Sequence, residues 1–142
     1  MLSRESFVSA SELTRTRAVE EAPAERPLGE HVLSSRTGEP LARMLVYRDR
    51  AIVEPLVKLH VTTPPFRQFL VNRILQEMKN SDEERAREGL IDPDQVLDYE
   101  VEAEGDLLKR IVIKNYREER RLDELRGAIR WTLARMYEKE YR

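Results

Sequence analysis

The sequence lacks several residue types and patterns on which common protein functions depend. It contains no cysteine, which excludes disulfides, thiol catalysis and cysteine-bound metals and favours a reducing compartment such as the cytosol. Its five glycines are scattered, so no glycine-rich phosphate loop occurs. The two histidines, His31 and His60, have no companion ligand at helical spacing. We therefore expect no metal ion and no other cofactor.

The chain also has little net charge and no long apolar segment. Its 25 lysines and arginines nearly balance 27 aspartates and glutamates, which leaves no general attraction for nucleic acid. No apolar stretch approaches the length that spans a bilayer, and the first residues lack the apolar core of a signal peptide. We therefore predict a cytoplasmic protein without membrane contact, in which any DNA contact is local.

Candidate catalytic groups do not converge in the sequence. The carboxylate pairs that could serve acid–base or Mg²⁺ chemistry are Asp92 with Asp94, in an expected turn, and Glu102 with Glu104, on the wet face of an expected strand. No nucleophile, base and orienting group can be nominated together. We therefore predict a protein that is not an enzyme and has no catalytic residues.

The clearest pattern in the chain is a hairpin followed directly by a long helix. Over residues 97–104, apolar and acidic residues alternate with a period of two, which predicts a strand with one buried and one solvated face. After a turn, the chain returns as a second strand over residues 108–116. A two-residue loop would mix the two faces, whereas a three-residue loop, Gly105–Leu107, keeps both faces consistent.

The three-residue loop predicts a specific register for the hairpin. On the apolar face it sets two pairs opposite each other: Val101 with Ile111, and Tyr99 with Ile113. On the solvent face it forms a charged ladder, in which acidic residues lie opposite basic ones: Asp98 with Lys114, and Glu102 with Arg110. The ladder is either a docking surface or an ordinary solvated sheet face. As a docking surface, its candidate partner-binding residues are Glu102, Arg110 and Lys114.

The segment that begins at about Arg117 predicts a long amphipathic helix. Its apolar stripe, expected to lie on the apolar face of the hairpin, consists of Leu122, Leu125, Ile129, Leu133 and Met136. Trp131 falls on the opposite face, and the residues beside it are small: Gly127, Ala128 and Ala134. A large aromatic side chain beside small residues indicates a second element packed closely there. That element is the N-terminal half, a second subunit or a partner, so Trp131 is a further candidate for partner binding.

The first half of the chain predicts a short helix and a second hairpin. Residues Phe7–Glu21 begin with a capping-box pattern, and prolines end the helix. Residues 31–35 and 41–47 flank a connection that contains Gly38 and Pro40, which is typical of a hairpin. The second of these strands is apolar nearly throughout, which places it inside a sheet or at a dimer interface.

The middle of the chain predicts one strong helix and one weak one. Residues 51–60 favour a strand or a broken helix because Pro55 interrupts an apolar run. A helix then begins near Thr62–Pro65, and its core stripe runs from Phe66 to Met78. A fresh capping box starts a separate polar helix over Ser81–Glu88, charged or small on every face and therefore expected to be solvated.

Residues 7–47 resemble a known family. The segment Val8–Leu13, which contains Ser-Ala-Ser-Glu, followed by the hairpin and apolar strand of Val32–Tyr47, is similar to the N-terminal module of the prevent-host-death (Phd/YefM) antitoxins. The resemblance implies a dimeric DNA-binding module that represses its own operon and a C-terminal segment that neutralises a toxin. The candidate phosphate contacts are Arg4, Arg15 and Arg17, although neighbouring glutamates offer these arginines alternative partners.

Together these patterns predict an α+β protein. It has a small sheet made of two β-hairpins, with a central helix and a long C-terminal helix packed on it. Residues 1–60 form a helix-plus-hairpin module and residues 61–142 a module of helix, hairpin and C-terminal helix, or the whole chain is one compact domain.

The predicted function is regulation by binding. The first hypothesis is an antitoxin-like transcriptional repressor, a homodimer that binds specific DNA through its N-terminal third and a protein partner through its C-terminal part. The alternative is a modulator or inhibitor of a larger machine such as RNA polymerase, or an assembly subunit, with no DNA contact of its own. Both hypotheses require another protein as partner.

Overall fold

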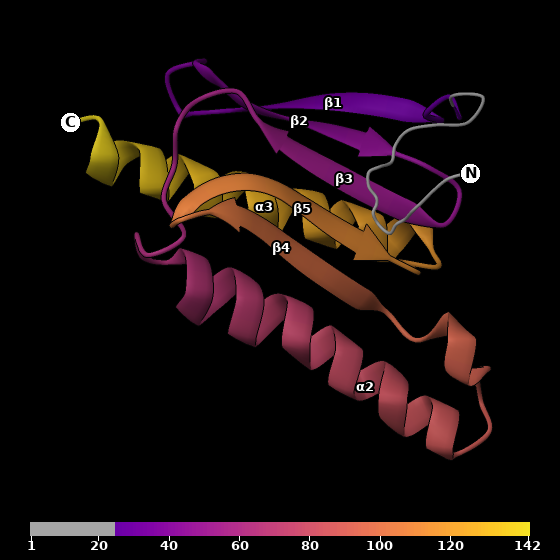
Figure 1. The fold of residues 1–142 in the computed structure, drawn as a ribbon. Coiled ribbons are helices and arrows are strands. Elements are labelled where there is room, and N and C mark those ends of the chain that lie inside the picture. Colours follow the sequence, from indigo (N-terminus) through magenta and orange to yellow (C-terminus); the bar gives the residue numbers. More distant parts are fainter. Residues whose placement is uncertain (1–24) are drawn as a thin grey trace, which may run out of the picture.

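Five strands and a layer of helices make up the fold of residues 25–142, the part of the chain that the computed structural model describes (Figure 1). The elements in chain order are β1 (Gly29–Ser34), β2 (Pro40–Val46), β3 (Arg50–Pro55), the π-helix η1 (Phe66–Leu75), α2 (Gln76–Arg87), the 3₁₀ turn η2 (Pro93–Gln95), β4 (Asp98–Glu104), β5 (Leu107–Lys114) and α3 (Glu119–Glu140). The predicted α+β class is confirmed.

One antiparallel sheet contains all five strands in the order β1-β2-β3-β5-β4. The apolar strand predicted over residues 41–47 is β2, and it lies inside the sheet between β1 and β3. The run interrupted by Pro55 forms a strand, β3, which ends at that proline. Because β3 pairs with β5, the two residue ranges assigned to separate modules in the sequence contribute to a single sheet.

The sheet has one apolar face because its strands alternate in the same phase. The register sets Met44 opposite Val53 and Val53 opposite Ile111, and all three side chains are fully buried. The neighbouring row continues with Ala51 and Ile113, which are also buried. This face forms the sheet side of a single core that the helices close.

The β4–β5 hairpin has the predicted register but not the predicted loop. All four expected pairs are present: Val101 with Ile111, Tyr99 with Ile113, Glu102 with Arg110, and Asp98 with Lys114. The turn, however, contains only Gly105 and Asp106, because Glu104 pairs with Leu107. A register shift beside Ala103 takes up the extra residue on β5 as a β-bulge. The bulge restores the phase that a two-residue turn alone would break.

The first helical element is one continuous helix over residues 66–87, in which η1 passes directly into α2. The predicted break after Met78 is therefore wrong. The predicted solvation of residues 81–88 is also wrong at one position, since Asp82 is fully buried. The reason is a set of hydrogen bonds from distant residues, which compensates the burial of a carboxylate inside an otherwise exposed turn.

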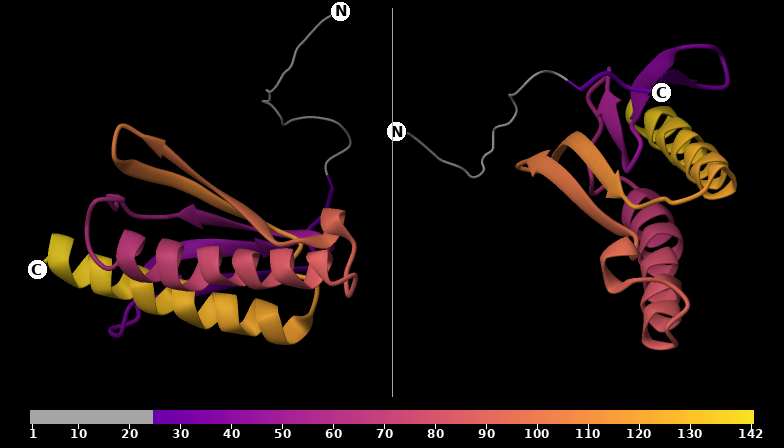
Figure 2. Two further views of the ribbon diagram at one scale, coloured as in Figure 1. Left: turned by 90° about the horizontal axis from the view of Figure 1, so that it is seen from below. Right: turned by 90° about the vertical axis from the view of Figure 1, so that its right-hand side faces the viewer.

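The second helical element, α3, buries the predicted stripe, since Leu122, Leu125, Ile129, Leu133 and Met136 are all 4% exposed or less. Burying each such side chain contributes roughly 2 kcal/mol. The expectation that α3 covers its own hairpin is wrong. Figure 2 shows α3 beside β1 and β2, while the helix of residues 66–87 contacts the start of β4, where Lys79 bonds Asp98. Tyr99 of β4 accordingly donates its hydroxyl hydrogen bond to Gln76.

The N-terminal predictions lie outside the described residues. They comprise the helix over Phe7–Glu21 and the candidate DNA contacts Arg4, Arg15 and Arg17. Among residues 25–142, no helix combines the length and the apolar character needed to cross a membrane.

Candidate functional site

A groove between the two helices is the best candidate for a functional site. The helix of residues 66–87 and α3 run antiparallel, because Phe69 contacts Trp131 at one end and Asp82 contacts Arg121 at the other (Figure 2). We call the contact of Phe69 with Trp131 the aromatic end of the groove. We call the cluster of Asp82, Arg117 and Arg121 the ionic end.

The ionic end is a buried carboxylate with three donors. Asp82 accepts hydrogen bonds from the Leu97 backbone N–H at 2.9 Å, from Arg117 Nη2 at 2.8 Å and from Arg121 Nη1 at 2.8 Å. Burial alone would raise the pKa of Asp82, but the hydrogen bonds from Arg121 and Leu97 outweigh it and hold that pKa below its usual value. The carboxylate therefore stays ionised and fixes two arginines at the start of α3.

The chain reaches the ionic end through an unusual backbone. Asn115 and Arg117, which join β5 to α3, have φ angles of 62° and 73° in the left-handed region that non-glycine residues seldom adopt. The Asn115 side chain offsets this cost by donating to the carbonyls of Asp94 and Val96, at 3.1 and 3.0 Å. The left-handed bend is thus held by hydrogen bonds on one side and by Asp82 on the other.

The aromatic end has the opposite character. The ring centroids of Phe69 and Trp131 lie 5.0 Å apart with an interplanar angle of 67°, an edge-to-face contact. The Arg135 guanidinium carbon lies 5.8 Å from the Trp131 ring centroid. Trp131 nevertheless keeps 48% of its surface exposed. The element that packs against Trp131 is therefore η1 of the same chain, and it covers only part of the indole ring.

The groove between the two ends is hollowed on its outer side. A depression of about 310 Å³ is lined by residues from both helices: Arg73, Ile74, Glu77, Met78, Ser81, Arg121 and Glu124. Ile74 and Met78 pack against the core, so the floor of the depression is apolar. Its rim carries charges of both signs.

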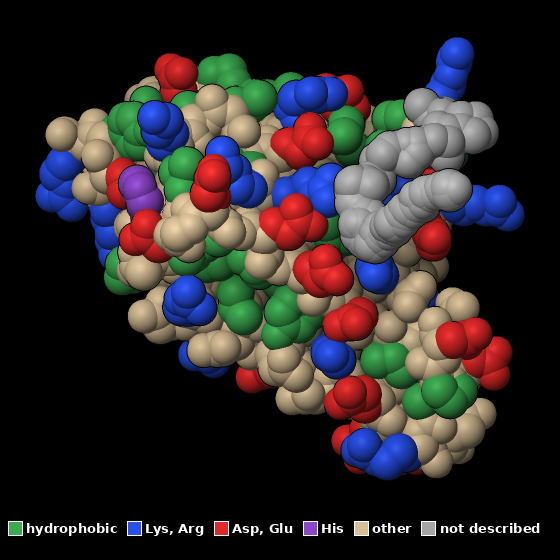
Figure 3. Space-filling model, in the orientation of Figure 1, with side chains coloured by type: hydrophobic (Ala, Val, Ile, Leu, Met, Phe, Trp, Pro, Cys, Tyr) green, Lys and Arg blue, Asp and Glu red, His purple; other side chains and the backbone are tan. Residues whose placement is uncertain are grey.

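The charged ladder on the outer face of the sheet forms only one of its two predicted ion pairs. Arg110 pairs with Glu102 at 3.0 Å, while Asp98 pairs with Lys79 of α2 rather than with Lys114 across the hairpin. Figure 3 shows this side of the molecule, where acidic and basic side chains alternate and neither sign prevails. The assignment of Glu102, Arg110 and Lys114 to partner binding stays a prediction.

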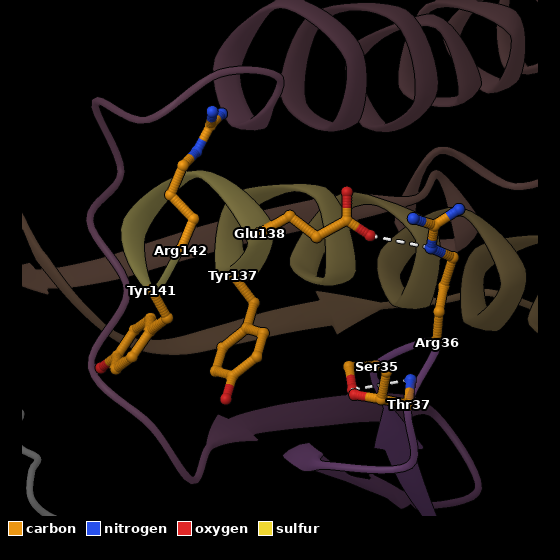
Figure 4. Close-up of a pocket in the computed structure, with 7 residues that line it drawn as sticks. All are labelled: Ser35, Arg36, Thr37, Tyr137, Glu138, Tyr141 and Arg142. Carbon is orange, nitrogen blue, oxygen red and sulfur yellow. Dashed lines mark hydrogen bonds and ion pairs between the residues drawn. The ribbon is translucent and has the colours of Figure 1, made fainter.

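A second hollow, of about 450 Å³, lies where the β1–β2 turn meets the end of α3. Figure 4 shows the rings of Tyr137 and Tyr141 side by side, stacked with their centroids 4.7 Å apart, while Arg142 extends away from them. Arg36 closes one side by pairing with Glu138 at 2.9 Å. Several polar groups of this hollow are already paired, since Ser35 bonds Thr37 and the Tyr141 hydroxyl donates to the Lys58 carbonyl, which makes it a weaker candidate than the groove.

The histidines have structural surroundings. His60 is hydrogen-bonded to Glu140 by its backbone N–H at 2.9 Å and by its ring nitrogen at 2.7 Å. The hydrogen bond to Glu140 raises the pKa of His60. His31 contacts Arg126 at 3.2 Å. No three His, Asp or Glu side chains gather in metal-binding geometry among residues 25–142.

Sequence reasoning found the aromatic end only in part and missed the ionic end. Trp131 was a candidate, but Phe69 was not. Asp82 lies four residues after Met78 and seven after Leu75, the stripe residues with which it shares a helix face. That continuation of the stripe was the available signal for its burial.

The chain matches no protein-family model, no curated protein and no solved structure with which it was compared.

Proposed function

We propose that this protein is a non-enzymatic regulatory binding protein and that the aromatic end of the groove is where it binds another protein. The observation that carries this proposal is the exposed half of Trp131, held in one orientation by Phe69. Tryptophan dominates the binding energy of many protein interfaces because it buries a large area at little cost in side-chain entropy.

The surroundings of Trp131 define the chemistry of the partner. Arg130 and Arg135 flank it on α3, and Arg73 lies further along the groove. Neither Arg73 nor Arg130 forms an ion pair with another of the described residues. A segment with an apolar side chain for the indole and carboxylates on either side would therefore match this surface in shape and charge.

The π-helical form of η1 supports the same surface. A π-helix is uncommon beyond a single turn, and such geometry is frequent at functional sites. Here it occurs in the element that carries Phe69, and the Gln76 N–H bonds to the Val71 carbonyl five residues earlier. The less usual geometry is thus found where the aromatic contact with α3 is made.

The test compares two aromatic residues of equal exposure. Trp131 and Tyr141 are both 48% exposed, so Tyr141→Ala is the matched control for Trp131→Ala. Tagged wild-type and variant proteins are used to capture partners from the native host. We expect one protein to be captured by wild type and Tyr141→Ala and lost with Trp131→Ala, with an affinity loss of at least roughly thirtyfold, or 2 kcal/mol.

The purified partner then allows a direct measurement. Trp131 is the only tryptophan of the chain, so its emission reports on its own burial when a tryptophan-free peptide from the partner is added. A blue shift that saturates supports the proposal. Equal capture by both variants would contradict it. Salt-sensitive binding of a specific duplex, lost with Arg15→Ala and Arg17→Ala, would instead favour the antitoxin-like hypothesis.

A further inference from the structure

Four arginines surround one hollow where the last turns of α2 meet the first turn of α3. The hollow has a volume of about 390 Å³ and is lined by Arg85, Arg117, Glu118, Arg120, Arg121 and Glu124. We call the four arginines the arginine cradle. They outnumber the two glutamates of the rim, and the buried Asp82 lies beneath Arg117 and Arg121.

Asp82 holds two of these arginines in place before any ligand arrives. Its ion pairs with Arg117 and Arg121 leave the two side chains only 17% and 15% exposed. Fixing long side chains in advance lowers the entropic cost of binding. Arg117 Nε is buried and has no hydrogen-bond partner among the described residues, so it can report on changes around this guanidinium without itself being open to a ligand.

The other two arginines stand free at the opening of the hollow. Arg85 and Arg120 are exposed and form no ion pair with any residue between 25 and 142. Arg120 belongs to the first turn of α3, where backbone N–H groups have no intrahelical acceptor. The side chain of Glu118 does not cap this turn. The partial positive charge of the helix start therefore adds to that of the guanidinium groups.

We propose that the arginine cradle binds a phosphoryl group. A phosphate dianion offers three acceptor oxygens, which suits several converging guanidinium groups better than a carboxylate with two. The site lies away from Trp131, and the inference does not depend on the proposed binding of a protein there.

Pyrophosphate is the first probe, and the readout is the Nε–Hε resonance of Arg117 together with the backbone amides of residues 118–121. On titration with pyrophosphate we expect saturable shifts confined to these groups and to the residues around Arg85 on α2. Arg85→Gln and Arg120→Gln each remove a free cation without touching Asp82, and each is expected to weaken binding about tenfold. Arg67→Gln, an exposed arginine of η1, is the matched control and should leave affinity unchanged.

Two outcomes of this titration would overturn the proposal. One is a shift that grows linearly without saturation, and the other is an equal affinity in the cradle variants and in Arg67→Gln. A second comparison separates the sources of the phosphoryl group. Tighter binding of a phosphoserine peptide than of pyrophosphate, with no binding of the unphosphorylated peptide, identifies a modified protein segment; the reverse order identifies a small molecule.

Discussion

The two ends of the helix groove are joined by opposite kinds of interaction. At the ionic end, a fully buried carboxylate is surrounded by two arginines and a backbone N–H. At the aromatic end, two rings touch edge to face and one of them keeps half its surface in water. Removal of one partner from a buried charge pair leaves an uncompensated charge, whereas removal of an exposed ring leaves only a surface gap.

This difference separates what holds the fold from what is free to bind. The ionic end connects three segments: α2, Leu97 directly before β4, and the start of α3. The aromatic end ties only η1 to α3. We therefore expect the two ends to respond very differently to substitution, although both lie in the same groove.

The largest effect is expected at the ionic end. Asp82→Ala leaves Arg117 and Arg121 without their carboxylate, and we expect a loss of about 3 kcal/mol in the free energy of unfolding. Urea denaturation followed by circular dichroism measures this loss. Glu84→Ala, an exposed position on the same helix, should change the unfolding free energy by less than about 0.5 kcal/mol. Similar values for the two variants would remove the distinction between the ends.

The second effect concerns the loss of folding stability at acidic pH. The pKa of Asp82 is lowered in the folded state, so its contribution to stability is present above the usual carboxyl value and is lost as pH falls through the lowered pKa. Asp82→Asn should therefore flatten the fall in stability below about pH 4. His60 provides the contrast, because its raised pKa stabilises the fold at acidic pH and that contribution is lost as pH rises through it. His60→Gln should alter the slope near neutral pH and also part of the acid limb, because His60 helps to lower the pKa of its partner Glu140. An unchanged slope near neutral pH would be inconsistent with this assignment.

The third effect is the coupling between the rings of the aromatic end. A double-mutant cycle with Phe69→Ala and Trp131→Ala should give a coupling of about 1 kcal/mol in the unfolding free energy, which is typical of one aromatic pair. Circular dichroism is the readout, since one variant removes the only tryptophan. A coupling of 3 kcal/mol or more would mean that the aromatic end, too, is mainly structural.

The smallest effect is expected on the outer face of the sheet. Arg110 and Glu102 are 42% and 40% exposed, and an ion pair open to water adds little to stability. The cycle of Arg110→Gln and Glu102→Gln should give a coupling below about 0.5 kcal/mol, and this coupling should decrease in 0.5 M salt. A large coupling that persists in salt would mean that this ladder, like the ionic end, contributes substantially to the stability of the fold.

The sequence was sufficient to predict the hairpin register because side-chain alternation sets it. Only one phase puts Tyr99 and Val101 on the same face as their apolar partners, and the structure has that phase. The loop length was not predictable in the same way. A two-residue turn with a bulge near Lys109 and a three-residue loop without one place the same side chains opposite each other.

The helical layer was harder to predict because its decisive contacts are long-range. Asp82 lies in a segment that is charged on nearly every side, and its partners Leu97 and Arg117 are 15 and 35 residues away in the chain. Asp82 continues the stripe of Leu75 and Met78, but hydrophobic periodicity counts only apolar residues, so the segment was assigned to solvent. The choice of which strands α3 covers also depends on the sheet order, which local patterns do not determine.

The order of the strands has a consequence for synthesis on the ribosome. Strands β1, β2 and β3 follow one another directly in the chain and in the sheet. The second neighbour of β3, however, is β5, whose last residue is Lys114. Until that residue has emerged, β3 presents an unpaired edge of N–H and C=O groups to any nearby strand. The nascent chain is therefore most exposed to mispairing with a neighbouring copy while the helix of residues 66–87 is being made.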